Sequence, residues 1–580
     1  MAKQTDNSII ISPPRQGLGQ SPHVGFGAIV NLDIDRLPGI AQMNTTTTKL
    51  SSTTITGLPL WQVRNPLNSS EAYSLDADGK FYKEDVDTGT FTLISGNVTT
   101  SASGNGLQIW KDYAFIARDA TLDTYGPLAG AIFTVTIASP AVFSKTAHGL
   151  VANDTIIFST TGALPTGLTA GTVYYVIAAG LTADAFEVST SQGGAAVNTS
   201  GSQSGTHTYR AWKSTNSFKT IDSDVDWHPM ITSKNDNKLY GGAGNYIFSL
   251  DEVSGQTFNP GTSATFTWTQ QALDLPSSYR IKCLEELGSY LMAGTWWGTL
   301  VTDFPVADIF PWDRSSVSFG QPISLKDFGV HAMINTGSEL VVLAGVSGTI
   351  YGCNGASAYV IGKVPGVILS GGRSLFYYPG AIAYWRGKVY FGVGTGGSGA
   401  TSCLIGVYSL RQTGQGNILN LEYLNSQLTD GSVANVDISS LLVIGRNSLQ
   451  IGWRSDTSYG IDSSTASSYN HTTDYSAYFE TPLYIVADNE ELNRFTKIKI
   501  LFAKNLASGE GVRVKFRTNL SDSFTVLSDK NNGVYTYATL GAVSSHVTTP
   551  GIDDCEMLQL RVEFLGSSST TPQLKQIKIC

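Results

Sequence analysis

A short phrase that recurs about every fifty residues is the sequence feature that most limits how this chain can fold. In each instance a turn containing Gly, Asn or Asp is followed by a run of strand-forming residues. The instances are residues 79–82 (GKFY), 111–115 (KDYAF), 237–242 (NKLYGG), 288–292 (GSYLM), 337–342 (GSELVV), 387–391 (GKVYF) and 446–449 (RNSL). The four steps from 237 to 446 are 51, 49, 50 and 59 residues long. A period near 50 residues is typical of four-stranded propeller blades.

A single four-stranded sheet cannot bury both of its faces, so repeated sheets are stable when each packs on the next around an axis. We therefore predict an all-β protein with a β-propeller of six or seven blades, closed between residues 40 and 470. Glycine supplies 61 of the 580 residues and charged residues only 14 %, which suits many short strands joined by tight turns. A row of separate β-sandwiches is the alternative architecture.

The repeat is interrupted once, between residues 111 and 237. That step spans 126 residues, about 76 more than one period. The surplus corresponds to residues 129–208, where strands such as 133–137 (FTVTI) and 173–177 (VYYVI) precede a Gly- and Ser-rich stretch at 193–205. We predict an inserted small β domain over 129–208. The flanking segments 25–128 and 209–475 are then the two parts of the propeller.

Both ends of the chain differ from the repeat in their pattern of apolar and polar residues. Residues 512–517 (VRVKFR) and 558–564 (LQLRVEF) alternate apolar and polar residues, as in an antiparallel sheet with one dry and one solvated face. We predict a C-terminal β-sandwich over residues 476–580. Residues 1–24 are polar and rich in Pro and Gly, which predicts an N-terminal arm that is ordered only against a partner.

Charge and cysteine usage narrow the classes of function. The formal charge is −9, and no long cluster of Lys and Arg occurs, so a dedicated DNA-binding role is not expected. The cysteines are widely spaced without a CxxC pair, which predicts buried thiols in a chain folded in a reducing cytoplasm: Cys283, Cys353, Cys403, Cys555 and Cys580. Neither a signal peptide at residues 1–15 nor an apolar run of about 18 residues is present. A protein of this kind that acts outside a cell leaves by lysis or inside a particle.

No catalytic, cofactor-binding or metal-ligating constellation is recognisable. The nucleophile-elbow GxSxG, the zinc motif HExxH and the phosphate-binding GxxxxGK[ST] are all missing. No two histidines have metal-ligand spacing; they are His23, His148, His207, His228, His331, His471 and His546. We therefore predict that the chain is not an enzyme and carries neither a cofactor nor a metal.

Three features of the sequence bear comparison with chemical motifs, and each fits a structural role better. Residues 74–81 (SLDADGKF) approximate the SxDxGxTW turn of some propeller glycosidases, but the glycine falls one place late and the tryptophan is missing, which favours an ordinary turn. The acidic pairs Glu285–Glu286 and Glu490–Glu491 fit solvated loops better than an acid/base dyad. Trp296 and Trp297, with Trp312 nearby, fit core packing first, then a subunit contact, then a sugar platform.

Residues 25–39 (GFGAIVNLDIDRLPG) open a propeller-like array that ends in a β-sandwich. In this order of parts the chain resembles tail proteins of tailed bacteriophages, and the inserted segment resembles a small β module of phage virion proteins. The phrases that carry the second resemblance are residues 146–150 (TAHGL), 161–172 (TGALPTGLTAGT) with Tyr174 and Tyr175, 193–201 (GGAAVNTSG) and 205–207 (GTH).

A large propeller with added β domains is similar to the nozzle of short-tailed phages, also called tail tubular protein B. The resemblance implies a virion protein made in the host cytoplasm. It also implies a homo-hexameric ring that continues the DNA-ejection channel, contacts the tail adaptor and anchors fibres or spikes. Viral DNA would pass an acidic lumen without specific binding. The alternatives are a tail-tip glycan-binding protein or depolymerase, and a head-to-tail stopper or head-decoration protein.

Overall fold

The computed structural model of the chain is built almost entirely from β-strands. It describes residues 9–11, 28–34, 40–50, 55–65, 70–94, 104–127, 130–222, 227–297, 307–365, 375–395, 405–413, 416–424, 436–446, 448–464, 469, 476–485, 495–552 and 555–580. Within these ranges the helical segments are the 3-10 turn η1 (Ser263–Thr265) and the single-turn helix α1 (Tyr537–Leu540). Neither has the length or the hydropathy to cross a membrane.

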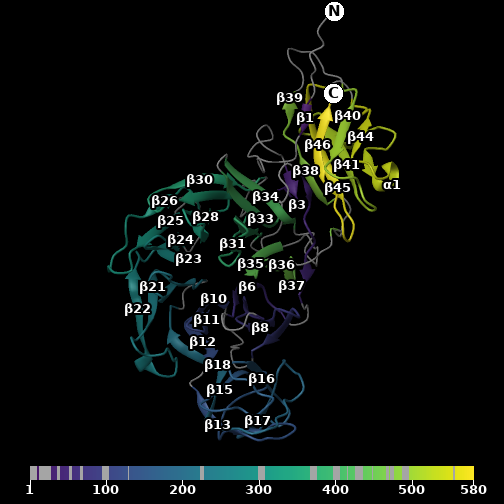
Figure 1. The fold of residues 1–580 in the computed structure, drawn as a ribbon. Coiled ribbons are helices and arrows are strands. Elements are labelled where there is room, and N and C mark those ends of the chain that lie inside the picture. The colour runs from purple at the N-terminus through teal and green to yellow at the C-terminus, as the bar shows by residue number, and fades with distance from the viewer. Residues whose placement is uncertain are drawn as a thin grey trace, which may run out of the picture. The chain divides into compact units, whose positions relative to one another are not determined.

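The chain forms two compact units, residues 63–275 and residues 1–62 together with 276–580. In the first unit, antiparallel four-stranded meanders follow one another along the chain (Figure 1). They are β6 (Pro59–Arg64), which crosses the unit boundary, β7 (Glu71–Asp76), β8 (Phe81–Asp85) and β9 (Thr90–Leu93); β10 (Gly104–Trp110), β11 (Tyr113–Arg118), β12 (Thr121–Pro127) and β18 (His207–Thr220); and β19 (Met230–Thr232), β20 (Leu239–Ala243), β21 (Tyr246–Glu252) and β22 (Phe266–Asp274).

The second unit continues the same pattern. Its meanders are β23 (Tyr279–Leu287), β24 (Tyr290–Trp297), β25 (Ala307–Trp312) and β26 (Ile323–Leu325); β27 (Val330–Asn335), β28 (Leu340–Ala344), β29 (Thr349–Cys353) and β30 (Ala358–Lys363); β31 (Ile382–Trp385), β32 (Lys388–Val393), β33 (Gly406–Thr413) and β34 (Gly416–Leu424); and β35 (Val436–Ile444), β36 (Ser448–Ser455) and β37 (Ser458–Ser463). The last sheet takes its fourth strand, β5 (Thr48–Lys49), from the start of the chain, with Lys49 opposite Asp462.

Every instance of the recurring phrase falls on a hairpin of one of these sheets. Six instances mark the hairpin between the first two strands of a sheet, and residues 79–82 mark the β7–β8 hairpin instead. At the β10–β11 turn, Lys111 and Asp112 have φ values of 49° and 68°, and at the β31–β32 turn Arg386 and Gly387 have 52° and 74°. Two successive positive φ angles are the signature of the type I′ turn, whose twist matches that of paired strands.

Consecutive sheets within each unit pack face to face, which confirms the predicted propeller-type stacking. In the first unit, Trp110 and Phe115 share a core with Leu239 and Phe248 of the next sheet. The second unit has three such shared cores, represented by Met292 with Val342, by Leu343 with Phe391, and by Tyr390 with Trp453. Each sheet therefore buries surface that it could not bury alone.

The first strand of several sheets carries a one-residue bulge whose side chain is buried and polar. The register shifts at Asn105 of β10, Lys282 of β23, His331 of β27 and Ser439 of β35. In such a bulge the extra residue leaves the hydrogen-bonded ladder, and its side chain points in a new direction. Lys282 Nζ donates to His331 Nδ1 over 2.6 Å, so two neighbouring bulges bond to each other between adjacent sheets.

The C-terminal β-sandwich is present, and it includes strands from the N-terminus. One sheet has the order β1 (Ile9–Ile11), β46 (Leu574–Ile579), β40 (Ile498–Phe502) and β44 (Ser545–Thr548). The other places β2 (Ala28–Val30) between β34 and β38 (Ala477–Glu480), followed by β45 (Met557–Leu565) and β41 (Gly511–Arg517). Ile9–Ile11 thus pairs with the chain's own C-terminal strand rather than lying in an arm. Ala28–Val30 joins two parts of the fold, because it pairs with β34 of the β31–β34 sheet on one side and with β38 of the sandwich on the other.

The N-terminal strands take these positions because their apolar residues complete a core that the C-terminal strands leave open. Ile11 and Ile29 are buried with Phe479, Ile500 and Val562 in one cluster. The remaining residues of the predicted arm lie outside the described ranges. Burial of each such aliphatic side chain stabilises the fold by about 1.5–3 kcal/mol. This gain explains why residues 9–11 are ordered within the protein, although the polar residues around them predicted an arm.

The segment between β12 and β18 folds into a closed sheet of its own (Figure 1). Its strands are β13 (Ala131–Val135), β14 (Phe143–Ser144), β15 (Thr155–Thr160), β16 (Val173–Ile177) and β17 (Ala185–Ser189), together with the first part of β18. The sheet closes because β18 pairs with β13 along one side and with β15 along the other. Aromatic rings fill the interior, and Phe143 and Phe158 stack at 5.0 Å between centroids. We call residues 130–211 the inserted module.

The inserted module is joined to the β6–β9 sheet by a buried polar network. Lys83 of β8 is 3 % exposed, and its Nζ donates to Asn153 O over 3.2 Å and to Thr155 Oγ1 over 3.1 Å. The hydroxyl of Tyr175 donates to Glu71 Oε1 over 2.8 Å. The Lys83 ammonium also lies 4.8 Å from the centre of the Tyr175 ring. A buried charge with several partners fixes one docked arrangement, because any other leaves the charge unsatisfied.

Asp154, beside this network, should make stability depend on pH. Burial raises its pKa from 3.8 to about 6, although Val151 N donates to it over 2.9 Å and Lys213 Nζ lies 3.9 Å away. The folded state therefore holds this proton more tightly than the unfolded chain does. The resulting stabilisation is complete below the unfolded pKa and is lost as the pH rises from about 4 through 6, by about 2–3 kcal/mol.

Asp154→Asn keeps an acceptor for Val151 and removes the titration. We expect the variant to be more stable than the parent protein at pH 7.5 and to lose this advantage near pH 4. Chemical denaturation at four pH values between 4.5 and 7.5 measures the difference. An equal difference at every pH would contradict a buried, titrating Asp154.

Candidate functional site

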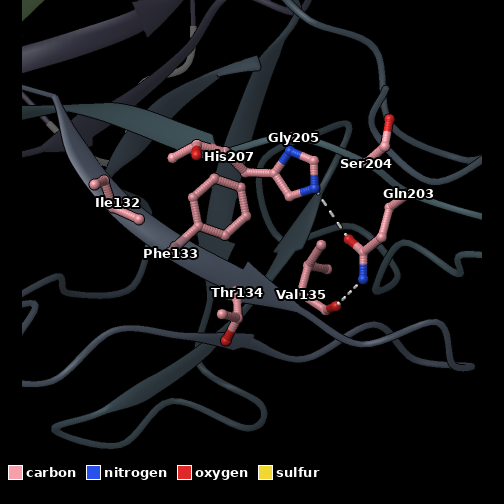
Figure 2. A pocket seen from close by; sticks show the side chains of 9 residues that line it. Ile132, Phe133, Thr134, Val135, Gln203, Ser204, Gly205 and His207 are labelled. Carbon is pink, nitrogen blue, oxygen red and sulfur yellow. Dashed lines mark hydrogen bonds between the residues drawn. The ribbon is translucent and has the colours of Figure 1, made fainter. Parts of the chain in front are cut away.

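A cleft in the described residues lies in the inserted module, where two paired strands separate. Ala131 and Phe133 of β13 pair with Tyr209 and His207 of β18. Beyond that point β13 pairs with β14, while the chain at 203–206 turns to pair with residues 161–163. The space between the diverging segments has a volume of about 310 Å³ (Figure 2). Its lining residues are Ile132, Phe133, Thr134, Val135, Gln203, Ser204, Gly205, Thr206 and His207.

A chain of hydrogen bonds spans the cleft and fixes its polar groups. Gln203 Nε2 donates to Val135 O over 2.8 Å, and Gln203 Oε1 lies 3.1 Å from His207 Nε2 (Figure 2). His207 Nδ1 lies 2.8 Å from Thr160 Oγ1, which accepts from Gly162 N over 3.1 Å. Because the amide nitrogen already donates to Val135, the amide oxygen must accept, so His207 carries its proton on Nε2. Nδ1 then accepts from the Thr160 hydroxyl.

Two glycines allow the wall of the cleft to form. Gly205 has φ = +80°, and a Cβ there would stand 2.5 Å from Gly162 N. A Cβ on Gly162 would stand 2.3 Å from Ser204 O. Since only glycine tolerates such approach, the phrases at 161–172 and 205–207, which carry the sequence resemblance, are also the ones that build this wall.

The cleft is suited to binding rather than to acid–base chemistry. Its lining contains amide, hydroxyl, imidazole and apolar groups and no Asp, Glu, Lys or Arg. His207 is buried with both ring nitrogens engaged, so neither is placed to transfer a proton to a ligand. The cleft was not identified from the sequence. The available signal was the 205–207 phrase, where glycine precedes Thr and His at the end of a Gly- and Ser-rich loop.

The tryptophans noted in the sequence do not form a platform in the described residues. Trp312 is buried, and its Nε1 donates to Ser316 O over 2.8 Å, so it packs in the core. Trp296 is half-buried, with Lys282 Nζ 5.5 Å from its ring centre. The side chain of Trp297 lies outside the described residues.

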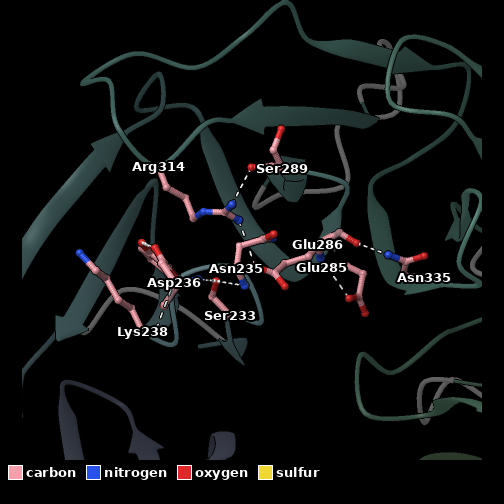
Figure 3. Close-up of polar contacts among 10 residues, drawn as sticks. Ser233, Asn235, Asp236, Lys238, Glu285, Glu286, Ser289, Arg314 and Asn335 are labelled. Atoms are coloured by element: carbon pink, nitrogen blue, oxygen red, sulfur yellow. Dashed lines mark hydrogen bonds and ion pairs between the residues drawn. The ribbon is translucent and has the colours of Figure 1, made fainter. Parts of the chain in front are cut away.

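The acidic pair Glu285–Glu286 forms part of a loop-anchoring network rather than a solvated loop (Figure 3). Glu286 is buried and pairs with Arg314, whose Nη1 lies 3.0 Å from Oε1. Arg314 Nη2 donates to Ser289 O over 2.6 Å, and Asn335 Nδ2 donates to Glu286 O over 2.5 Å. A carboxylate held in this way is positioned for structure and not for proton transfer. Glu490 and Glu491 lie outside the described residues.

The turn at residues 74–81 is an Asp-capped β-hairpin. Asp76 Oδ1 accepts from the backbone nitrogens of Asp78 and Lys80 over 3.1 and 2.8 Å, and Tyr82 donates to Oδ2 over 3.2 Å. Burial raises the pKa of Asp76 to about 6. The Arg118 guanidinium donates to Gly79 O over 2.7 Å. All of these bonds hold the turn itself, as the sequence interpretation of an ordinary turn predicts.

The histidines and cysteines of the described residues occupy structural positions. No group of three or more His, Cys, Asp or Glu residues with metal-binding geometry occurs there. His148 and His228 are buried, and their ring nitrogens bond to backbone atoms. Cys283, Cys353 and Cys555 are buried and Cys580 is exposed. His23, His471 and Cys403 fall outside the described residues.

Comparisons with known proteins found similarity among solved structures alone. No family model and no curated protein sequence matches the chain. Among solved structures, YCF48 bound to D1 peptide is 10 % identical, with 75 % of this chain and 97 % of that chain covered and a TM-score of 0.37. The β-propeller domain of Myceliophteria thermophila Cps50 (Swd1) is 9 % identical, with 72 % and 99 % covered and a TM-score of 0.36. The phage phi92 endosialidase is 12 % identical, with 72 % and 68 % covered and a TM-score of 0.32.

Proposed function

We propose that this chain is a structural protein of a bacteriophage tail, a nozzle or hub that is not an enzyme. Six copies would form a closed ring that continues the DNA-ejection channel, contacts the tail adaptor and anchors fibres or spikes. The proposal rests on the sequence resemblance stated above, together with an architecture of stacked sheets that carries two additional β modules.

The observation that favours a scaffold is that buried charged side chains join separate segments of the chain by several hydrogen bonds each. Buried charged groups serve as connectors: Lys83 joins the inserted module to the β6–β9 sheet. Glu422 of β34 accepts from Asn44 over 2.6 Å, from Lys388 over 2.9 Å and from Ser409 over 2.6 Å. This binds the segment between β4 (Gln42–Met43) and β5 to the β31–β34 sheet. Rigid joints of this kind suit a part that bears mechanical load.

The net charge supports passage of DNA rather than capture of it. A chain of charge −9 that lines a channel in six copies repels the phosphate backbone, and no counterion release drives binding. DNA would therefore slide along the lumen without sequence-specific contacts.

Purified full-length protein is expected to assemble into rings of six copies. Native mass spectrometry gives the copy number, and averaged electron micrographs give the ring. A cryo-electron microscopy map of the particle then locates the chain between adaptor and fibres. A chain that stays monomeric and is missing from the tail contradicts the proposal. Location in the head or at the head-to-tail junction would favour a decoration or stopper protein.

A depolymerase at the tail tip is the enzyme alternative. Incubation of the protein with host capsule or lipopolysaccharide tests it directly. We expect no increase in reducing sugar ends, because the described acidic side chains that the sequence singled out are held in structural bonds.

A further inference from the structure

We propose that the cleft of the inserted module is a binding site for a neutral saccharide. This inference goes beyond the scaffold role and does not depend on it, since the cleft lies within one compact module. Four properties of the cleft lead to this proposal. Its lining carries no charged side chain, and one wall is an aliphatic side chain that solvent reaches. The amide of Gln203 is held in place by hydrogen bonds, and the backbone groups at the cleft's edges are already hydrogen-bonded.

Ile132 supplies an apolar wall in the cleft that solvent reaches. It is 62 % exposed on the outer face of β13, whereas its neighbour Phe133 points into the module and is 3 % exposed. An exposed aliphatic side chain beside hydroxyl groups matches the C–H face of a sugar ring, which is apolar at its centre and polar at its rim. The neutral lining disfavours a charged ligand, because no opposite charge compensates its desolvation.

The polar groups around Ile132 are both donors and acceptors. Gln203 is held at Val135 and His207, which leaves one amide N–H and one oxygen lone pair for a ligand. The hydroxyls of Thr134 and Thr206 form no hydrogen bond to the described residues, and both residues line the cleft. Ser204 Oγ accepts from Ala163 N over 3.2 Å and retains its own proton for donation. A ligand rich in hydroxyl groups can pair with each of these.

A peptide strand fits the cleft less well. The 203–206 segment is already paired through Ala163 N to Ser204 O at 3.0 Å and Ser204 N to Ala163 O at 2.9 Å. On the opposite wall the Val135 carbonyl is capped by Gln203. Strand addition requires an open row of backbone donors and acceptors, which these bonds occupy.

The test uses the full-length chain and saturation-transfer NMR with glucose, galactose and N-acetylglucosamine at millimolar concentration. Glucuronic acid is the matched charged probe, since it differs from glucose by a carboxylate. We expect transfer to at least one neutral sugar and weaker transfer to glucuronic acid. Dextran, a polymer of glucose, distinguishes a polysaccharide ligand from a free sugar. A site for a polysaccharide binds dextran more tightly, per glucose unit, than it binds glucose, whereas a site for a free sugar does not.

Two substitutions on one segment locate the site. Ile132→Asp places a charge in the cleft and is expected to abolish the transfer. Ile137→Asp is the control, because Ile137 is also exposed, at 46 %, but does not line the cleft. Thr206→Val removes one hydroxyl and should weaken binding about fivefold. Circular dichroism and thermal unfolding of each variant confirm that the module remains folded.

The proposal is overturned if no neutral sugar gives transfer, or if Ile132→Asp and Ile137→Asp reduce it equally. Preferential binding of glucuronic acid would also overturn it. A chemical-shift response to an unstructured peptide with no response to sugars would assign the cleft to protein contact instead.

Discussion

Replacement of Arg118 by methionine is expected to lower the free energy of unfolding by about 3–5 kcal/mol. Arg118 is 1 % exposed; it pairs with Asp123 and donates to Gly79 O over 2.7 Å. The substitution leaves the buried Asp123 carboxylate without its cation and the Gly79 carbonyl without its donor. Chemical denaturation followed by tryptophan fluorescence measures the loss.

Lys80→Met is the matched control, because Lys80 lies next to Gly79 in the same turn. Its pair with Asp78, at 3.5 Å, is exposed to solvent, and loss of such a pair costs about 0–1 kcal/mol. The double variant Arg118→Met/Asp123→Leu should be less destabilised than the sum of its single variants, since it removes both charges. Additive effects would show that the two residues act independently.

Replacement of Lys83 by methionine is expected to loosen the inserted module from the β6–β9 sheet at a cost of about 3 kcal/mol. The Lys83 ammonium is buried and donates to Asn153 and Thr155, and burial lowers its pKa below the usual value. Methionine keeps the aliphatic stem and loses both bonds. Hydrogen–deuterium exchange should therefore rise first in residues 153–155 and 173–177.

Lys145→Met is the control within the module, because Lys145 Nζ bonds to the adjacent Thr146 O in an exposed position. Its exchange pattern should match that of the parent protein. Tyr175→Phe removes the bond to Glu71 and should reproduce part of the Lys83 effect in the same peptides. If Lys83→Met and Lys145→Met behave alike, the network does not fix the module.

At the candidate site, the sequence shows the individual glycines but does not show that they meet to form a cleft. The glycines at 162 and 205 are visible in the sequence as members of two short phrases. Their close approach, 2.5 Å from a Cβ on Gly205 to Gly162 N, joins positions 43 residues apart. Nothing in the spacing indicates which loops meet, so the cleft, the role of Gln203 and the tautomer of His207 required the folded chain.

The bulges show a similar limit inside the repeat. Lys282 lies in β23 and His331 in β27, and no sequence pattern predicted the burial of either side chain. The register shifts bury both, and each satisfies the other between adjacent sheets. Strand periodicity describes a regular ladder. A one-residue insertion reverses the phase of the alternation at a point that the sequence does not mark.

The sequence alone determined the hairpins, their fifty-residue spacing, the presence of an interruption after the β10–β11 hairpin and the all-β character, because turn chemistry and alternation are local properties of neighbouring residues. Only the tertiary structure decided that Ile9–Ile11 and Ala28–Val30 join the C-terminal sandwich and that Thr48–Lys49 completes the last sheet. Those pairings link residues more than 400 positions apart. They form because an unpaired strand edge needs hydrogen-bond partners and an exposed apolar surface is stabilised by burial. Any segment of the right shape can supply both, whatever its distance along the chain.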